Sequence, residues 1–383
     1  MSSNAVAGAA VEYTAQVSSP NLTSTARLSI GADALHVVSP FAAIDVPFYS
    51  INAITTADFV VRVITDDGPY EFSALGNWCQ PFHDALAEAF GQAVLRGMFV
   101  RSAPVFIASG DYQVSEPGVS LAGSGTPIRV FDDAVVSLPP NLAARRVPLC
   151  FATGFQPVAF GASLRVGPDE SYSYSRLGND TAGFVAAVEG QLRALREATL
   201  AQVNAIDPSL APAAASQIAG LVSAGTAAPM TGLARIAPSF VAALEARLAA
   251  SVAALPYKAF KAASQNIWVG MRAQGDDYLL WLIVASPNGN SAAVEFAVPD
   301  TATFVYRTGG QFAQFARQLN IALEAIDFKR EVIWTPDDQL TEPDWKMAIK
   351  RNSALRFVRA NYVGRAIHTD GWQTAVNKLC EAG

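Results

Sequence analysis

Hydrophobic positions in the first half of the chain form the same pattern twice. Tyr70 and Phe72 alternate with polar residues, as do Tyr172 and Tyr174, and a period of two is typical of one face of a strand. Both pairs precede Leu-Gly-Asn, which predicts a turn, and apolar residues then recur at four-residue steps, which predict the buried stripe of a helix. Counted from Gly76 and Gly178, the stripe occupies positions +6, +10 and +14: Phe82, Leu86 and Phe90 in the first copy, and Phe184, Val188 and Leu192 in the second.

The repeat extends upstream of these strands. Asp33-Ala34 corresponds to Asp133-Ala134, and Val46-Pro47 to Val147-Pro148, with an offset of 100 to 102 residues throughout. Short alternating runs between these anchors predict a small antiparallel barrel or sandwich in each copy. The expected strands are 26–30, 34–39, 48–54, 60–65 and 70–73 in the first copy, and 128–131, 134–138, 149–155, 159–166 and 171–175 in the second.

A run of strands closed by one helix resembles the pleckstrin-homology-like (PH-like) superfamily, as in tandem PH-like domains of bacteria. The resemblance covers residues 11–98 and 104–200 and implies a curled seven-stranded sheet capped by a C-terminal helix. Members that bind phosphoinositides carry a basic cluster around the first hairpin. Here only Arg27 and Arg129 occupy the corresponding places, which argues against recognition of a polyphosphate head group and leaves protein binding.

The second half of the chain has a different composition. Residues 180–256 are rich in alanine and predict helices, the last with an apolar stripe of Phe240, Leu244, Leu248, Val252 and Leu255. Phe315, Leu319 and Leu323 repeat the +6, +10 and +14 spacing after Gly309, so a third, diverged copy is preferred over an unrelated sheet and helix. We therefore expect an α+β protein divided into PH-like units at 1–100 and 101–205, a helical insert at 206–256, a third unit at 257–334, and a linker with a helical tail at 335–383.

The composition limits which classes of protein this chain can belong to. Of 383 residues, 51% are hydrophobic and 16% charged, which excludes disorder for most of the chain. The net charge of −6 argues against nucleic acid as a partner of the whole surface. Residues 1–10 lack the features of a signal peptide, and the apolar run 278–285 is too short to span a bilayer, so we expect a cytoplasmic protein. Cys79, Cys150 and Cys380 form no paired motif and are expected to be free thiols.

Motifs for catalysis or metal binding were not found. His36, His83 and His368 lie in no metal-ligand spacing, and the acid pairs 132–133, 276–277 and 337–338 are typical of turns. The Gly/Ser-rich stretch 118–125 lacks the lysine of a phosphate-binding loop and predicts a flexible hairpin loop. We expect no enzymatic activity and no cofactor.

The most distinctive charge feature is a basic segment near the C-terminus, without any acidic residue and interleaved with apolar positions. Such a segment predicts a basic amphipathic helix, which binds an acidic partner, an anionic membrane or nucleic acid. Docking on the acidic body of the same protein is the favoured interpretation. The candidate residues for binding a partner or an anion are Lys346, Lys350, Arg351, Arg356, Arg359 and Arg365.

These features together predict a non-enzymatic scaffolding protein that binds protein partners or self-associates. Two alternatives are retained. One is peripheral binding to an anionic membrane or nucleic acid through the basic C-terminal helix. The other is an enzyme with an unrecognised site within 268–307 or between the units.

Overall fold

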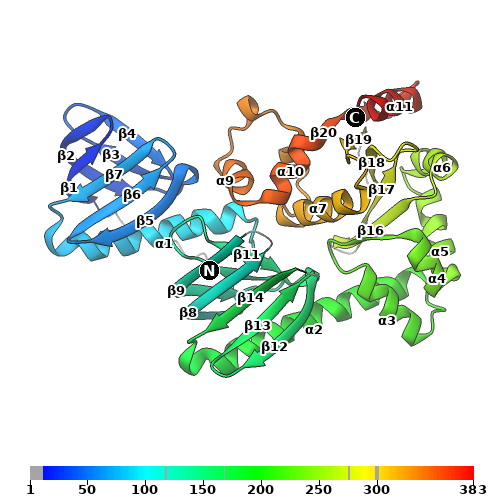
Figure 1. Ribbon diagram of the computed structural model, residues 1–383, viewed down its shortest axis with the longest axis horizontal. Coiled ribbons are helices and arrows are strands. Elements are labelled where there is room, and N and C mark those ends of the chain that lie inside the picture. Colours follow the sequence, from blue (N-terminus) through cyan, green and yellow to red (C-terminus); the bar gives the residue numbers. More distant parts are fainter. Residues whose placement is uncertain (1–11, 117–118, 168, 275–276, 298–301) are drawn as a thin grey trace, which may run out of the picture.

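The computed structural model of the protein describes residues 12–116, 119–167, 169–274, 277–297 and 302–383. It contains helices and three antiparallel sheets, of seven, seven and six strands (Figure 1). The expected α+β class is confirmed at this level. No helix within the described ranges has the length and apolar character needed to cross a membrane.

The first unit is one sheet followed by one long helix. Its strand order is β4-β3-β2-β1-β7-β6-β5. The chain therefore runs from the middle of the sheet to one edge at β4, crosses to the opposite edge at β5, and returns to the middle at β7. The elements are β1 (Glu12–Ser19), β2 (Leu22–Ile30), β3 (Ala34–Val38), β4 (Ala43–Pro47), β5 (Ile51–Ala57), β6 (Val60–Thr65), β7 (Gly68–Ser73) and α1 (Cys79–Gly97).

The second unit repeats this topology with the order β11-β10-β9-β8-β14-β13-β12. Backbone conformation repeats too: Ala74 and Arg176 both have positive φ, as do Gly76 and Gly178 directly before the helices. The elements are β8 (Phe106–Glu116), β9 (Val119–Val130), β10 (Ala134–Ser137), β11 (Arg145–Pro148), β12 (Ala152–Val158), β13 (Gly161–Val166), β14 (Glu170–Ser175) and α2 (Thr181–Ile206).

The helix of each unit packs on its own sheet through the predicted stripe. Phe82 of α1 meets Phe72 of β7 with ring centroids 5.6 Å apart, and Phe184 of α2 meets Tyr174 of β14 at 5.2 Å. These contacts bury the rings completely, and the helix thereby closes one face of each sheet.

Two expectations for these units were wrong. No ladder joins β4 to β5, or β11 to β12, within the described residues, so the sheets are open and not closed barrels. The stretch expected as a flexible loop is largely strand: residues 119–125 belong to β9. Position 123 requires glycine, because a Cβ there would lie 2.4 Å from the ring of Tyr112 on the paired strand. Gly118 lies outside the described residues.

The third sheet is not a copy of the first two. Its six strands follow chain order, β15 to β20, and form a simple meander. The predicted stripe of α7 is nevertheless buried at Phe315, Leu319 and Leu323. The strands are β15 (Ala227–Pro229), β16 (Ile267–Gln274), β17 (Asp277–Ala285), β18 (Ser291–Phe296), β19 (Ala302–Arg307) and β20 (Tyr362–Ile367).

Helices cover both faces of this sheet, which explains its continuous apolar strands. Leu280, Leu282 and Val284 of β17 pack toward the Ala-rich helices, whereas Trp281 and Ile283 pack toward α7. The first layer contains α3 (Pro212–Leu221), α4 (Met230–Ile236), α5 (Pro238–Ala249), α6 (Ala254–Ala263) and α11 (Trp372–Ala382); the second contains α7 (Phe312–Ala325), α8 (Glu331–Trp334), α9 (Pro343–Arg351) and α10 (Ser353–Asn361).

The expected division at 206–256, 257–334 and 335–383 therefore differs from the structure, where all three segments build one layered unit. Residues 206–256 supply β15 and most of the first helical layer, residues 257–334 supply α7 and α8 of the second layer, and residues 335–383 supply β20, α9, α10 and α11. The last Ala-rich helix also ends earlier than expected, at Ala249, and leaves Val252 and Leu255 exposed.

The units share contacts along their borders. The edge strand β5 is covered by the loop after β10: the Ile54 N–H donates to the Pro140 carbonyl at 2.8 Å, and the Leu142 N–H to the Asn52 carbonyl at 3.0 Å. Met347 of α9 belongs to the hydrophobic core of the first unit. In Figure 1, α9 and α10 lie between the first sheet and the third.

Candidate functional site

The basic segment is not one helix. It consists of α9, α10 and the edge strand β20. The break falls at Asn352, whose side chain accepts a hydrogen bond from the Leu355 N–H at 2.8 Å and so starts a new helix. The expectation of a continuous amphipathic helix is therefore wrong, and the six basic residues do not form one face.

Most of these cations contact the protein itself. Lys350 lies 2.9 Å from both carboxylate oxygens of Asp66 in the first unit, and Lys346 lies over the ring of Tyr49 at 4.8 Å. Arg359 donates to carbonyls and to Asp337 beside α8. Arg365 is exposed on β20. These contacts hold α9 and α10 against their neighbours.

The other two cations, Arg351 and Arg356, line a cavity of about 510 Å³ between the units. Its walls come from the end of α1, the second sheet, α7 and the junction of α9 with α10. Arg145 and Arg146 of β11 face the same space. The charged residues around it are Glu116, Arg145, Arg146, Glu170, Glu324, Arg351 and Arg356.

Arg146 is neutralised by two carboxylates. Its guanidinium donates to Glu324 of α7 and to Asp133, both at 2.7 Å. The side chains of Arg146 and Glu324 are only 8% and 9% exposed. Burial alone would lower the pKa of Arg146, but the two carboxylates raise it above its ordinary value. This buried bridge ties the second unit to the third.

Arg351 has a different environment. Its Nη1 donates to the Asn141 carbonyl at 3.0 Å, and its Nε contacts the Met347 sulfur. Its Nη2 is buried without a hydrogen-bond partner, and no carboxylate pairs with it among the described residues. Burial, followed by the charge of Arg145, lowers the pKa of Arg351 to about 10, so it is still protonated at neutral pH.

Glu170 completes the polar wall of this cavity. It accepts a hydrogen bond from the hydroxyl of Tyr172, two residues along β14. Burial raises the pKa of the Glu170 carboxyl, and Glu116 raises it further, while Tyr172 and Arg145 oppose the shift.

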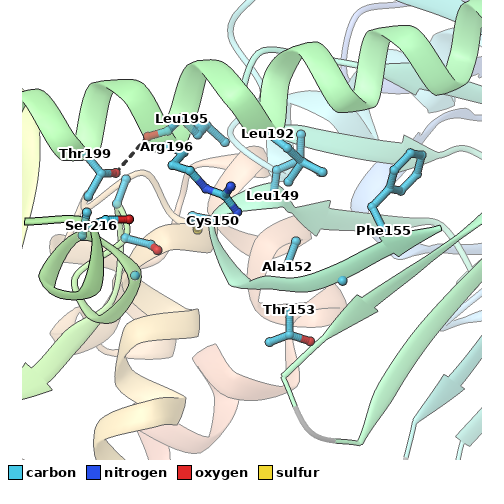
Figure 2. A pocket seen from close by; sticks show the side chains of 15 residues that line it. Leu149, Cys150, Ala152, Thr153, Phe155, Leu192, Leu195, Arg196, Thr199 and Ser216 are labelled. Carbon is cyan, nitrogen blue, oxygen red and sulfur yellow. Dashed lines mark hydrogen bonds between the residues drawn. The ribbon is translucent and has the colours of Figure 1, made fainter. Parts of the chain in front are cut away.

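A second cavity, of about 490 Å³, lies between β12, α2 and α3. Figure 2 shows Arg196 extending from α2 toward Cys150, with Thr199 donating to the Leu195 carbonyl behind it. Burial, followed by the charge of Glu324, raises the pKa of the Cys150 thiol well above its ordinary value. Such a thiol is a poor nucleophile at neutral pH.

A buried polar cluster in the third sheet escaped the sequence analysis. The Thr303 hydroxyl donates to the Glu295 carboxylate at 2.5 Å and accepts from the Trp372 indole N–H at 2.8 Å. His368 Nε2 lies 3.3 Å from the same carboxylate. Glu295, Thr303 and His368 line neither of the two cavities, so the cluster is placed to hold α11 on the sheet.

The remaining candidates take part in local contacts. His36 pairs with Asp45 across β3 and β4 at 2.6 Å, and His83 lies 3.0 Å from its neighbour Asp84. Asp276 lies outside the described residues. Within the described ranges, no group of three or more His, Cys, Asp or Glu is arranged to hold a metal ion. The three cysteines are free.

Arg145, Arg146 and Glu324 were missed because their meeting depends on packing between distant elements. The only Arg-Arg pair in the sequence, at 145–146, was the one available indication. No protein-family model matches the chain, and no curated protein matches it significantly.

Proposed function

We propose that this protein is a non-enzymatic scaffold that binds protein partners through two tandem PH-like units. The superfamily assignment is supported by the strand order 4-3-2-1-7-6-5 followed by a helix, which occurs in both units. A fold alone assigns no function, so the proposal depends on surface features that the two units have in common.

The observation that carries it is an exposed phenylalanine at the same hairpin tip of each unit. Phe59 connects β5 to β6 and is 79% exposed; Phe160 connects β12 to β13 and is 75% exposed. Both have left-handed backbone, with φ of 62° and 60°.

Phenylalanine is an unfavourable residue at these positions. The left-handed region costs a residue with a Cβ about 1–2 kcal/mol, and glycine would occupy it freely. An exposed ring adds little burial in return. Strained residues of this kind are often found where a ligand is bound, and aromatic side chains dominate binding energy at protein interfaces.

The tip of the first unit has a second aromatic residue at the same end of the sheet. Thr56, near the tip of β5, lies 3.8 Å from the sulfur of Cys79, and Trp78 immediately precedes Cys79. Trp78 is 61% exposed and packs edge-on against Tyr13. Phe59 and Trp78 therefore offer an apolar surface suited to a groove on a partner protein.

The test separates strain from binding. Phe59→Gly and Phe160→Gly remove the rings and relieve the left-handed backbone, so each should raise stability by about 1 kcal/mol while capture of the protein partner from native lysate is lost. Asp58→Gly is the matched control, because Asp58 also has positive φ in the same turn but the ring remains.

The proposal requires that a stoichiometric partner survives high salt with wild type and with Asp58→Gly, and is lost with the double phenylalanine variant. Equal capture by all three proteins would refute the role of the tips. If the species captured is a second copy of the chain, light scattering will show a dimer that the double variant lacks. Recovery of lipid or nucleic acid alone, released by salt, would favour the peripheral-binding alternative.

A further inference from the structure

The cavity between the units contains an arginine whose charge the protein does not balance. Arg351 is held by a carbonyl, a thioether and the ring of Phe90, whose centroid lies 5.3 Å from its Cζ, and its buried Nη2 has no hydrogen-bond partner. An unmatched buried donor on a charged group is costly unless something binds to it.

A second guanidinium strengthens the positive field at this point. Arg145 donates to the carbonyls of Leu142 and Ala144 and approaches Glu116 only to 3.8 Å. Arg356 donates to the carbonyls of Ile349 and Lys350, at the end of α9. Backbone carbonyls thus orient the guanidinium groups of all three arginines. Because a carbonyl carries no net charge, the positive charges remain free to attract an anion.

The nearby carboxylates form no close ion pair with these arginines among the described residues. Glu324 is bonded to Arg146, and Glu170 accepts from Tyr172. Among the described residues, Glu116 is the only carboxylate within ion-pair distance of Arg145, Arg351 or Arg356, and its contact with Arg145 is long, at 3.8 Å. The arrangement differs from the Arg146 bridge, where two carboxylates meet one guanidinium at 2.7 Å.

We propose that this cavity binds a small organic oxyanion, bearing a phosphate or carboxylate group, through Arg351 and Arg145 with Arg356 at the edge. Guanidinium groups recognise such oxygens through paired hydrogen bonds. The volume of about 510 Å³ lies within the range of small-molecule sites. The ligand would contact the second unit, α7 and the α9–α10 junction together, and so link binding to the arrangement of the units.

The experiment measures thermal unfolding and calorimetric binding of the full chain with inorganic phosphate, glycerol phosphate or succinate, each against sodium chloride of equal ionic strength. Wild type should be stabilised by at least one of these anions. Arg351→Gln should weaken binding about tenfold or more, the loss expected for hydrogen bonds to a charged group. Arg365→Gln is the control, because Arg365 is exposed on β20 and does not line the cavity.

Arg356→Gln provides a second variant at an exposed position, in case Arg351→Gln fails to fold. It should weaken the anion response while leaving unfolding in chloride nearly unchanged. No stabilisation of wild type by any of the three anions overturns the proposal. So does a response of equal size in wild type and in both cavity variants, because it would show a general ionic effect. Preference for glycerol phosphate or for succinate identifies the oxyanion.

Discussion

At the scale of single residues, close packing decides where glycine is required. At Gly161 a Cβ would lie 1.9 Å from the Tyr174 carbonyl oxygen, and at Gly270 it would lie 2.1 Å from the indole of Trp281. Neither position needs a left-handed backbone. Each glycine lets a neighbouring strand or a large ring approach, which is a constraint of space and not of conformation.

The buried carboxyl of Glu170 makes the free energy of unfolding depend on pH. Because its pKa is raised in the folded protein, its contribution to stability is present below the ordinary value of 4.5 and is lost as pH rises through the folded pKa. Above that pH, Glu170→Gln should be more stable than wild type, by about 1.4 kcal/mol for each unit of the shift.

Urea unfolding of both proteins between about pH 4 and pH 8 will measure this difference. Glu197→Gln, at an exposed position on α2, supplies the background for replacing a carboxylate by an amide. A stability difference between wild type and Glu170→Gln that does not change with pH would contradict the burial of this carboxylate.

At the scale of elements, α1 carries two glycines with opposite expected effects. A Cβ on Gly97 would lie 2.3 Å from Cγ and 2.6 Å from Cβ of Met347, whereas a Cβ on Gly91 meets nothing within 4 Å. Gly97→Ala should lower the free energy of unfolding by about 1–3 kcal/mol through overpacking against α9. Gly91→Ala should raise it by about 0.5–1 kcal/mol, the usual gain in a helix.

Denaturant unfolding of the two variants gives a direct comparison within one helix. If Gly97→Ala is as stable as Gly91→Ala, then α9 does not pack against the end of α1.

Elements with strong local patterns were predictable from the sequence. The stripes of α1, α2 and α7 and most inner strands follow from the spacing of Phe and Leu, because each such face is buried within its own unit. Strands β1, β4, β8 and β11 were missed, since their sequences are short or mix small and polar residues. The break at Asn352 was missed because a cap depends on one side-chain hydrogen bond.

At the scale of the whole molecule, topology and the cavity could not be predicted. The third sheet takes its edge strands from the Ala-rich region and from the tail, which are 133 residues apart between Pro229 and Tyr362. Arg146 and Glu324 are 178 residues apart in sequence yet bonded in space. No periodic pattern specifies such pairs, since they arise only when separately folded layers pack together.

The ion pair between Arg146 and Glu324 should contribute to the stability of the whole molecule, because it joins the second unit to the third. Arg146→Met leaves Glu324 buried without its partner and should cost about 3–5 kcal/mol of unfolding free energy. Adding Glu324→Leu should recover most of that loss, because the stranded charge is removed. Calorimetry and urea unfolding of the three proteins will measure it. A cost below about 1 kcal/mol for the single variant would place the pair at the surface.

The position of Met347 in the first core has a consequence for synthesis on the ribosome. The chain emerges N-terminus first at about 5–20 residues per second, and Met347 follows Gly97 by 250 residues. The nascent first unit therefore lacks Met347 for more than about ten seconds. At the start of that interval it also lacks the loop that covers strand β5. An uncovered strand edge is a template for intermolecular pairing. The first unit to be synthesised is therefore among the last to be completed. Until then, its exposed strand edge must be kept from pairing with other chains by factors outside this protein.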